Sequence, residues 1–196
     1  MEKKENDYDY SFKLICIGDG KKTKFLQLNT DSFNKESKQN IGVDYLTRTL
    51  IINNEIIKLY LWDLASQERF RSLRNMYISK TDGIFLFFDV NNKYSYDAII
   101  QEYDFIRSQH EGIAPIMLIG NNCHSECREI SKEDVIEFAI SHDLLYREVD
   151  ISKGFGINEA VKELVTFIIQ CKTETDIMEC SNRAVIHRKN NSQNCI

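Results

Sequence analysis

A short apolar run, FKLICI at residues 12–17, is followed at once by GDGKKT at residues 18–23. The run predicts a buried strand ending at a glycine turn, and TKFLQLN, which comes next, suits a helix. Such a turn gathers backbone N–H groups around an anion, while Lys22 adds positive charge and Thr23 offers a hydroxyl to Mg²⁺. The complete phosphate-loop motif needs two more residues and a glycine in place of Lys21, so a lysine-rich surface turn is the alternative interpretation.

The rest of the chain alternates between strand-like and helix-like segments. Strands are predicted at 12–17, 43–52, 55–63, 83–90, 115–120 and 146–151, the second and third being a hairpin joined by Asn53-Asn54. Helical periodicity covers residues 95–110, 131–141 and 156–171. This order predicts an α/β fold, a six-stranded and mostly parallel sheet with helices on both faces, whose chemistry lies in loops at the carboxyl ends of the strands.

Length and charge limit the class of protein. The 196 residues suffice for one compact domain, which we expect at residues 10–172 after an N-terminal extension, 1–9, and before a flexible polar tail, 173–196. With 25 Lys and Arg against 30 Asp and Glu, the net charge of -5 argues against a nucleic-acid partner. No apolar run approaches the roughly 20 residues that span a bilayer, and the N-terminus lacks a signal-peptide core, so we expect a cytoplasmic chain. Its six scattered cysteines indicate reduced thiols.

Colinear motifs along most of the chain carry a family resemblance. They are YDYSFKLICIGD (8–19), IGVDY (41–45), KLYLWD (58–63), QERFRSL (67–73), GIFLFFDV (83–90) and GINEAV (156–161). Together they resemble the Rab branch of the Ras-like small GTPases. The resemblance implies the small-GTPase fold, which is a P-loop NTPase fold, and a switch in which GTP with Mg²⁺ holds two loops that hydrolysis to GDP releases.

The resemblance also implies roles for particular residues. The phosphate-binding set is Gly18, Asp19, Gly20, Lys21, Lys22, Thr23 and Ser66. The Mg²⁺ set is Thr23, Asn40 and Asp63, and Gln67 is the catalytic residue that orients the attacking water. The base-binding set is Asn121, Asn122, His124, Ile151 and Ser152. The surface for effector proteins is Ile41, Gly42, Val43, Asp44, Tyr45, Trp62, Phe70 and Tyr77, although ordinary core packing would explain about half of these apolar residues.

Several of these positions depart from the family pattern. Lys21 and Ser66 stand where the family has glycine, and Asn40 stands where a threonine would bind Mg²⁺. In the family motif N-K-x-D, Asn122 replaces the lysine and His124 replaces the carboxylate that accepts two guanine N–H groups. A hydrogen bond to a charged group contributes about 1.5–3 kcal/mol, or roughly tenfold to a hundredfold in affinity. We therefore expect weakened GTP and GDP binding and little hydrolysis; local compensation, giving an active GTP-hydrolysing switch, is the alternative.

Cysteines suggest two further features. Cys123, His124 and Cys127 are one ligand short of a closed zinc site, so packing is the favoured explanation. The penultimate Cys195 is a lipidation candidate, although the end of the chain matches neither paired cysteines nor the C-a-a-X form. The family resemblance implies effectors, an exchange factor, a GTPase-activating protein and a role in vesicle traffic. It also implies attachment of the tail to the cytosolic face of an endomembrane or the plasma membrane.

Overall fold

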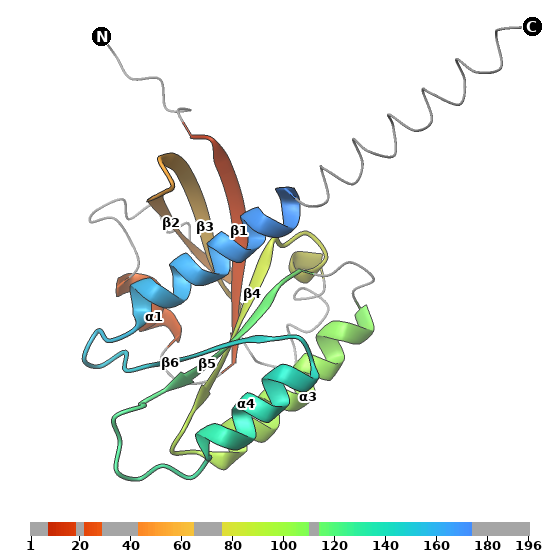
Figure 1. Ribbon diagram of the computed structural model, residues 1–196. Helices are drawn as coiled ribbons and strands as arrows, with labels where there is room; N and C mark the ends of the chain where they lie inside the picture. Colours follow the sequence, from red (N-terminus) through yellow and green to blue (C-terminus); the bar gives the residue numbers. More distant parts are fainter. Residues whose placement is uncertain (1–7, 19–21, 29–42, 65–75, 110–113, 174–196) are drawn as a thin grey trace, which may run out of the picture.

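One sheet organises the described part of the chain. The computed structural model describes residues 8–18, 22–28, 43–64, 76–109 and 114–173. Six strands form the sheet there: β1 (Tyr10–Gly18), β2 (Val43–Ile52), β3 (Glu55–Leu64), β4 (Gly83–Asp89), β5 (Ile116–Asn121) and β6 (Leu145–Val149). Their order is β2-β3-β1-β4-β5-β6, with β2 and β3 antiparallel and all other pairs parallel (Figure 1). The predicted α/β sheet, mostly parallel, is confirmed.

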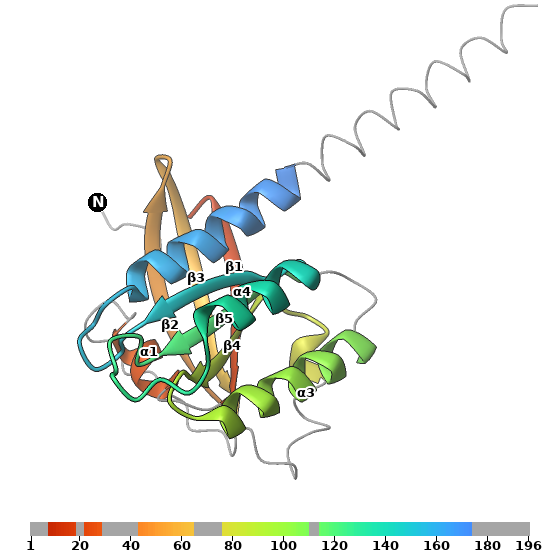
Figure 2. The ribbon, with the colours of Figure 1, turned by 60° about the horizontal axis from the view of Figure 1, so that its bottom comes forward.

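Helices cover both faces of this sheet. The named helices are α1 (Lys22–Leu28), α3 (Lys93–Gln109) and α4 (Lys132–Ser141), and a further helix runs over residues 157–173. The helix at 157–173 and α1 pack on one face, and α3 and α4 pack on the other, as Figures 1 and 2 show from two directions. A short helical turn also spans residues 76–78.

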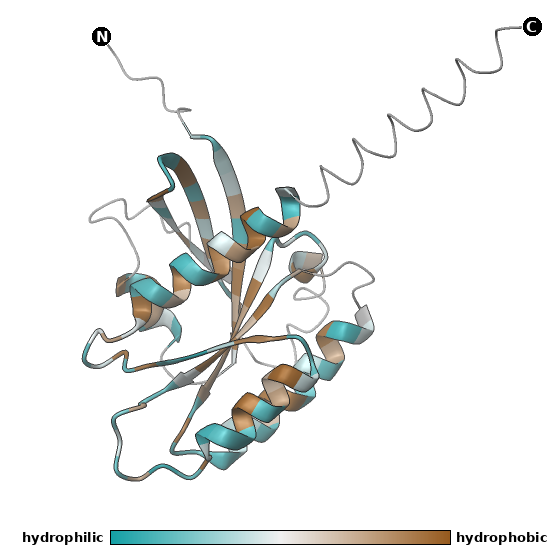
Figure 3. Ribbon diagram, in the orientation of Figure 1, coloured by the Kyte–Doolittle hydropathy of each residue, from teal (hydrophilic) through white to brown (hydrophobic). Residues whose placement is uncertain are grey.

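The alternation of side chains along β1 explains why two layers of helices are needed. Phe12, Leu14 and Cys16 face the core cluster shared with α1 and helix 157–173, whereas Ile15 and Ile17 face the cluster shared with α3 and α4. All five are at most 1% exposed. A strand that is apolar on both faces is typical of the middle of a parallel sheet. Figure 3 shows the result: the central strands are largely hydrophobic, and the helices alternate between hydrophobic and hydrophilic bands.

Local signals in the sequence set the hairpin and the start of α4. Asn53 and Asn54 adopt φ values of 53° and 67° in the β2–β3 turn, as a two-residue hairpin turn requires. The Ser131 side chain caps α4 by accepting a hydrogen bond from the Asp134 backbone N–H at 3.1 Å. Both features agree with the predicted hairpin and helix start.

The strand order places β1 between β3 on one side and β4 on the other, which is the switch point at which α/β proteins bind ligands. Gly18 closes β1 there with φ of 110°. A Cβ atom on Gly18 would lie 2.2 Å from the Phe87 carbonyl oxygen. Glycine is therefore required at the first position of the GDGKKT segment, because another side chain would collide with β4.

Candidate functional site

Three predicted site residues meet at the carboxyl end of β1 and β3. The Thr23 hydroxyl donates to Asp63 Oδ2 at 2.5 Å, and Lys22 Nζ lies 3.2 Å from Asp63 Oδ1. The Lys22 ammonium also donates to the Leu64 carbonyl oxygen. Asp63 lies within β3, paired with Cys16 of β1 and Asp44 of β2, rather than in the loop after the strand. The sheet register therefore holds its carboxylate beside the first turn of α1.

This cluster, which we call the lysine–threonine–aspartate cluster (Lys22, Thr23 and Asp63), has the chemistry of a phosphate and Mg²⁺ site. The Lys22 and Asp63 side chains are only 13% and 14% exposed, so their charges interact in a partly desolvated place. A hydroxyl and a carboxylate are hard oxygen ligands, which Mg²⁺ prefers, and an ammonium is suited to phosphate oxygens. The residues present therefore fit part of a Mg²⁺–phosphate site.

Other predicted residues lie outside the described part of the chain. These are Asp19, Gly20, Lys21, Asn40, Ile41, Gly42, Ser66, Gln67, Phe70 and Cys195. Val43 and Asp44 are placed as backbone in β2, opposite Leu64 and Asp63.

The predicted base-binding residues lie in two loops that the structure ties together. Asn121 is fully buried, and its Oδ1 accepts the Ile151 backbone N–H at 3.0 Å. Asn122, at φ of 64°, donates from Nδ2 to Asp89 Oδ2 at 2.7 Å. The Cys123 backbone N–H donates to the Val149 carbonyl oxygen at 3.2 Å. The loop after β5 and the loop after β6 therefore form one unit.

Asp150, which directly precedes the predicted base-binding residues Ile151 and Ser152 but was not predicted to bind the base, is the charged centre of this unit. The residue is 3% exposed, and its Oδ1 accepts the Ser152 hydroxyl at 2.5 Å and the Lys153 backbone N–H at 3.2 Å. Its Oδ2 lies 3.3 Å from His124 Nδ1 and 3.4 Å from Lys153 Nζ. The hydrogen bond from Ser152, followed by that from His124, lowers the pKa of Asp150 to about 2 despite burial. Asp150 is thus a carboxylate whose two oxygens are both engaged inside the protein.

His124 is held by Asp150 and by an aromatic neighbour. Its ring packs edge-on against Phe155 with centroids 4.7 Å apart, and Asp150 and Phe155 exchange backbone hydrogen bonds at 3.0 and 3.1 Å. The Cys123 Sγ atom lies 3.5 Å from His124 Nδ1, and burial together with Glu148 raises the pKa of the Cys123 thiol. Cys123 is partly exposed, and the described residues contain no group of three or more His, Cys, Asp or Glu side chains placed to hold a metal.

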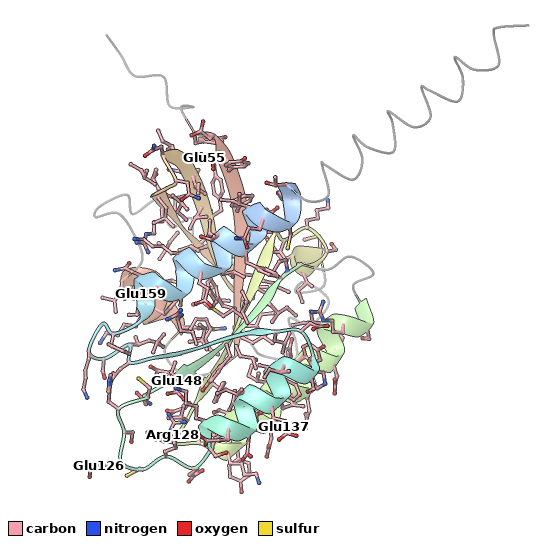
Figure 4. All side chains as sticks on the ribbon, viewed as in Figure 1. Glu55, Glu126, Arg128, Glu137, Glu148 and Glu159 are labelled. Atoms are coloured by element: carbon pink, nitrogen blue, oxygen red, sulfur yellow. The ribbon has the colours of Figure 1, made fainter. Side chains whose placement is uncertain are left out.

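An ion pair also connects the loop after β5 to β6. Arg128 donates to Glu148 Oε1 at 2.8 Å, and the Tyr146 hydroxyl donates to the same oxygen at 2.6 Å. Figure 4 labels both residues, Glu148 in β6 and Arg128 in the loop that follows β5. Burial and the bond to Glu148 raise the pKa of Tyr146, so the phenol stays protonated as the donor.

The aromatic rings of three residues of the predicted effector surface contact one another, Tyr45 stacked on Trp62 and Tyr77 tilted against Trp62. The Tyr45 and Trp62 ring centroids are 4.8 Å apart, and those of Trp62 and Tyr77 are 5.1 Å apart. The ammonium of Lys13, which the sequence did not indicate, lies 4.9 Å from the Trp62 centroid and 4.5 Å from that of Tyr77. Partial burial and the neighbouring Lys80 lower the pKa of Lys13. These aromatic side chains are half-buried at the edge of the core rather than inside it.

The fold and the lysine–threonine–aspartate cluster define a class, the α/β proteins that bind phosphate at the carboxyl end of their first strand. The sequence matches the Ras family over residues 13–170. The chain therefore belongs to the Ras family, and its relatives place it in the Rab branch.

Three of those relatives show how far the similarity extends. The "Ras-related protein Rab-18" of Lymnaea stagnalis is 33% identical over 85% of this chain and 84% of its own length. The "GTP-binding protein ypt3" of Schizosaccharomyces pombe is 31% identical over 85% of this chain and 79% of its own length. The "Ras-related protein Rab-8B" of Bos taurus is 34% identical over 78% of this chain and 76% of its own length.

Proposed function

We propose that this chain is a divergent Rab-type protein of intracellular vesicle traffic that binds GTP and GDP weakly, hydrolyses GTP slowly, and acts chiefly by binding effector proteins. The proposal combines two features of the site. The phosphate end (Lys22, Thr23 and Asp63) keeps the family's residues, whereas the base end (the loops around His124 and Asp150) is altered. Each part rests on different residues of the described structure.

At the phosphate end, Lys22 would contact the phosphates, and Thr23 and Asp63 would hold Mg²⁺, directly or through water. When bound, Mg²⁺ neutralises phosphate charge. The Lys22 ammonium is already engaged by Asp63 at 3.2 Å and by the Leu64 carbonyl oxygen. A phosphate must compete with these two acceptors, which lowers the net gain from binding.

At the base end, one observation carries the proposal of weak binding. Position 124 is an imidazole, and the carboxylate that lies beside it, Asp150, has both oxygens engaged by Ser152, Lys153 and His124. An engaged carboxylate cannot also accept the N1–H and 2-amino groups of guanine. The base therefore loses a pair of charge-assisted hydrogen bonds, each contributing about 1.5–3 kcal/mol.

The aromatic stack supports the proposed binding of effectors. Tyr45, Trp62 and Tyr77 are partly exposed, and large aromatic side chains of this kind are enriched in protein interfaces. Val43 and Asp44, which are also predicted for this surface, directly precede Tyr45 on β2, an edge strand of the sheet. An exchange factor and a GTPase-activating protein are expected partners of any residual nucleotide cycle.

The proposed membrane attachment is through the C-terminal tail rather than through the folded domain. Within the described residues, no helix combines the length and apolar character needed to cross a bilayer. We propose that a lipid on Cys195 holds the protein at the cytosolic face of an endomembrane or the plasma membrane, with a cytoplasmic pool. A single prenyl chain gives only marginal and reversible anchoring, so the two pools would exchange.

The test is the nucleotide content of the protein as purified. The full chain is isolated in buffer with Mg²⁺ and no added nucleotide, denatured, and its supernatant separated by chromatography. We expect far less than one equivalent of guanine nucleotide, and GDP affinity in the micromolar range or weaker by titration calorimetry. Stoichiometric GDP that survives dilution would refute the proposal. A Lys22→Met variant is the control, because any specific phosphate binding must fall further in it.

The alternative is an active GTP-hydrolysing switch, and the retained Lys22, Thr23 and Asp63 favour it. Single-turnover phosphate release from bound GTP distinguishes the two. A Gln67→Leu variant provides the matched control, since it removes the residue expected to orient water. Phosphate release that depends on Gln67 would establish the enzyme, whereas equal and negligible rates in both proteins support the binding role.

A further inference from the structure

The base end of the site holds a carboxylate and an imidazole whose positions decide what the pocket can recognise. Asp150 and His124 lie in neighbouring loops, after β6 and β5, and their side chains meet at 3.3 Å. In the order of the family motifs, the carboxylate is expected in the loop after β5, but here it stands in the loop after β6. An acidic side chain is therefore present beside position 124, but it comes from the loop after β6.

Hydrogen-bond accounting shows what this arrangement leaves available. An ionised carboxylate only accepts, so the contact between Asp150 Oδ2 and His124 Nδ1 requires a proton on Nδ1. The Cys123 thiol, 3.5 Å from the same nitrogen, is a weak donor and a weak acceptor and does not compete with a charged partner. In the neutral ring, Nε2 then carries a lone pair. His124 therefore offers one acceptor, on a side chain that is 43% exposed.

The contacts around Asp150 and His124 hold both side chains in this geometry. Oδ1 of Asp150 is fixed by the Ser152 hydroxyl and the Lys153 backbone N–H, and the ring of His124 rests against Phe155. The backbone bonds between Asp150 and Phe155 hold both partners of His124 in one short loop. Rotation of the carboxylate toward a ligand would break these bonds together.

We propose that the His124–Asp150 pair turns the base pocket into a site for 6-oxopurine nucleotides in general, hypoxanthine as well as guanine. This inference rests on the proposed function, because it assumes that a nucleotide base lies against position 124. Guanine and hypoxanthine share an N1–H donor, which the single Nε2 acceptor can take. Only guanine carries a 2-amino group, and no second acceptor is provided for it on His124. Adenine presents a lone pair at N1, which faces the lone pair of Nε2 unfavourably.

The first experiment needs no nucleotide. Long-range proton–nitrogen NMR of the full chain at about pH 8.5, well above the usual imidazole pKa of about 6.5, reports which ring nitrogen of His124 carries the proton. We expect the proton on Nδ1 in the wild type and a shift toward Nε2 in Asp150→Asn. The His142 signals serve as an internal control, since Nδ1 of this residue contacts the Ser141 hydroxyl and the Phe138 carbonyl oxygen rather than Asp150. A wild-type proton on Nε2 would overturn the proposal.

The second experiment compares GDP, inosine diphosphate and ADP by titration calorimetry with Mg²⁺. In the wild type we expect GDP and inosine diphosphate to differ by less than about threefold, with ADP weaker. The double variant His124→Asp with Asp150→Ser returns the carboxylate to the loop after β5, and should prefer GDP over inosine diphosphate by about tenfold to a hundredfold. A tenfold GDP preference in the wild type would overturn the proposal.

The outcomes separate this inference from the proposed function. Tight but equal binding of GDP and inosine diphosphate would contradict weak nucleotide binding and support the present inference. Weak binding with a strong GDP preference would support weak nucleotide binding and contradict the present inference. If the wild type binds neither diphosphate and the double variant binds GDP, the inference is wrong, because His124 then excludes the base. If neither protein binds either diphosphate, the inference and the proposed nucleotide binding both fail.

Discussion

Replacing Lys22 by methionine should destabilise the protein even when no nucleotide is present. The Lys22 ammonium lies 3.2 Å from Asp63 Oδ1 and donates to the Leu64 carbonyl oxygen, with only 13% of the side chain exposed. Two unit charges at that distance attract by about 5 kcal/mol at an effective dielectric constant of about 20. Desolvation cancels much of this attraction, so a net loss of about 1.5–3 kcal/mol is expected. Methionine keeps the aliphatic stem, so the change isolates the charge.

The assay is urea unfolding in EDTA without phosphate, read by circular dichroism. Lys153→Met is the matched control, because Lys153 also lies near an aspartate, at 3.4 Å, but is 62% exposed. Exposed pairs contribute about 0.2–1 kcal/mol and are screened by salt. If Lys22→Met lowers the free energy of unfolding no more than Lys153→Met does, the reasoning is refuted. Mg²⁺ with saturating GDP should then stabilise the wild type more than Lys22→Met, because only binding to the folded state adds stability.

Three further predictions concern the backbone, an acid group and a thiol. Gly18→Ala should lower the free energy of unfolding by more than about 3 kcal/mol, because the new Cβ would lie 2.2 Å from the Phe87 carbonyl oxygen at φ of 110°. Gly154→Ala, at φ of 70° with open space around it, should lose only about 1 kcal/mol, and equal losses would contradict the steric argument. Because the pKa of Asp150 is lowered to about 2, its stabilisation is present above about pH 4 and is lost as the pH falls through about 2. The difference in unfolding free energy between wild type and Asp150→Asn, at most about 2.5 kcal/mol, should therefore narrow on acidification, and a difference that stays constant would contradict this prediction. Burial raises the pKa of Cys16, so Ellman's reagent should modify this thiol only after unfolding, and fast labelling of the native protein would show the assignment to be wrong.

Much of the fold was predictable because its signals are local. The apolar runs at 83–90 and 115–120 became β4 and β5, and Asn53-Asn54 formed the hairpin turn, because strand periodicity and positive φ depend on neighbouring residues. The cluster of Lys22, Thr23 and Asp63 was also predictable from motif order, since parallel strands end at one edge of the sheet. The strand predicted at 55–63 already contained Asp63, and β3 extends one residue further, to Leu64.

Asp150 and Lys13 could not be found in the same way. Asp150 follows β6, and its bonds to the neighbouring Ser152 and Lys153 are local turn contacts that do not by themselves mark it as part of the base site. Its contact with His124 spans 26 residues of sequence, so it exists only when β5 and β6 pair in register. Lys13 likewise meets Trp62 and Tyr77 only because β1 lies beside β3 in the sheet. The sequence did carry one chemical signal for Asp150. His124 replaces the family's acidic residue in the loop after β5, and Asp150 supplies an acidic residue in the loop after β6.

The amino-acid sequence by itself determined the α/β order of elements, the burial of the first strand and membership of the Ras family, because hydrophobic periodicity and motif order are properties of the chain itself. Tertiary structure alone decided which groups neutralise one another. Lys22 is bonded across 42 residues to the end of β3, and the two oxygens of Asp150 are divided among Ser152, Lys153 and His124. Hydrogen bonds are directional and act over about 3 Å, so such partners are fixed by the register of strands and the shape of loops rather than by residue type.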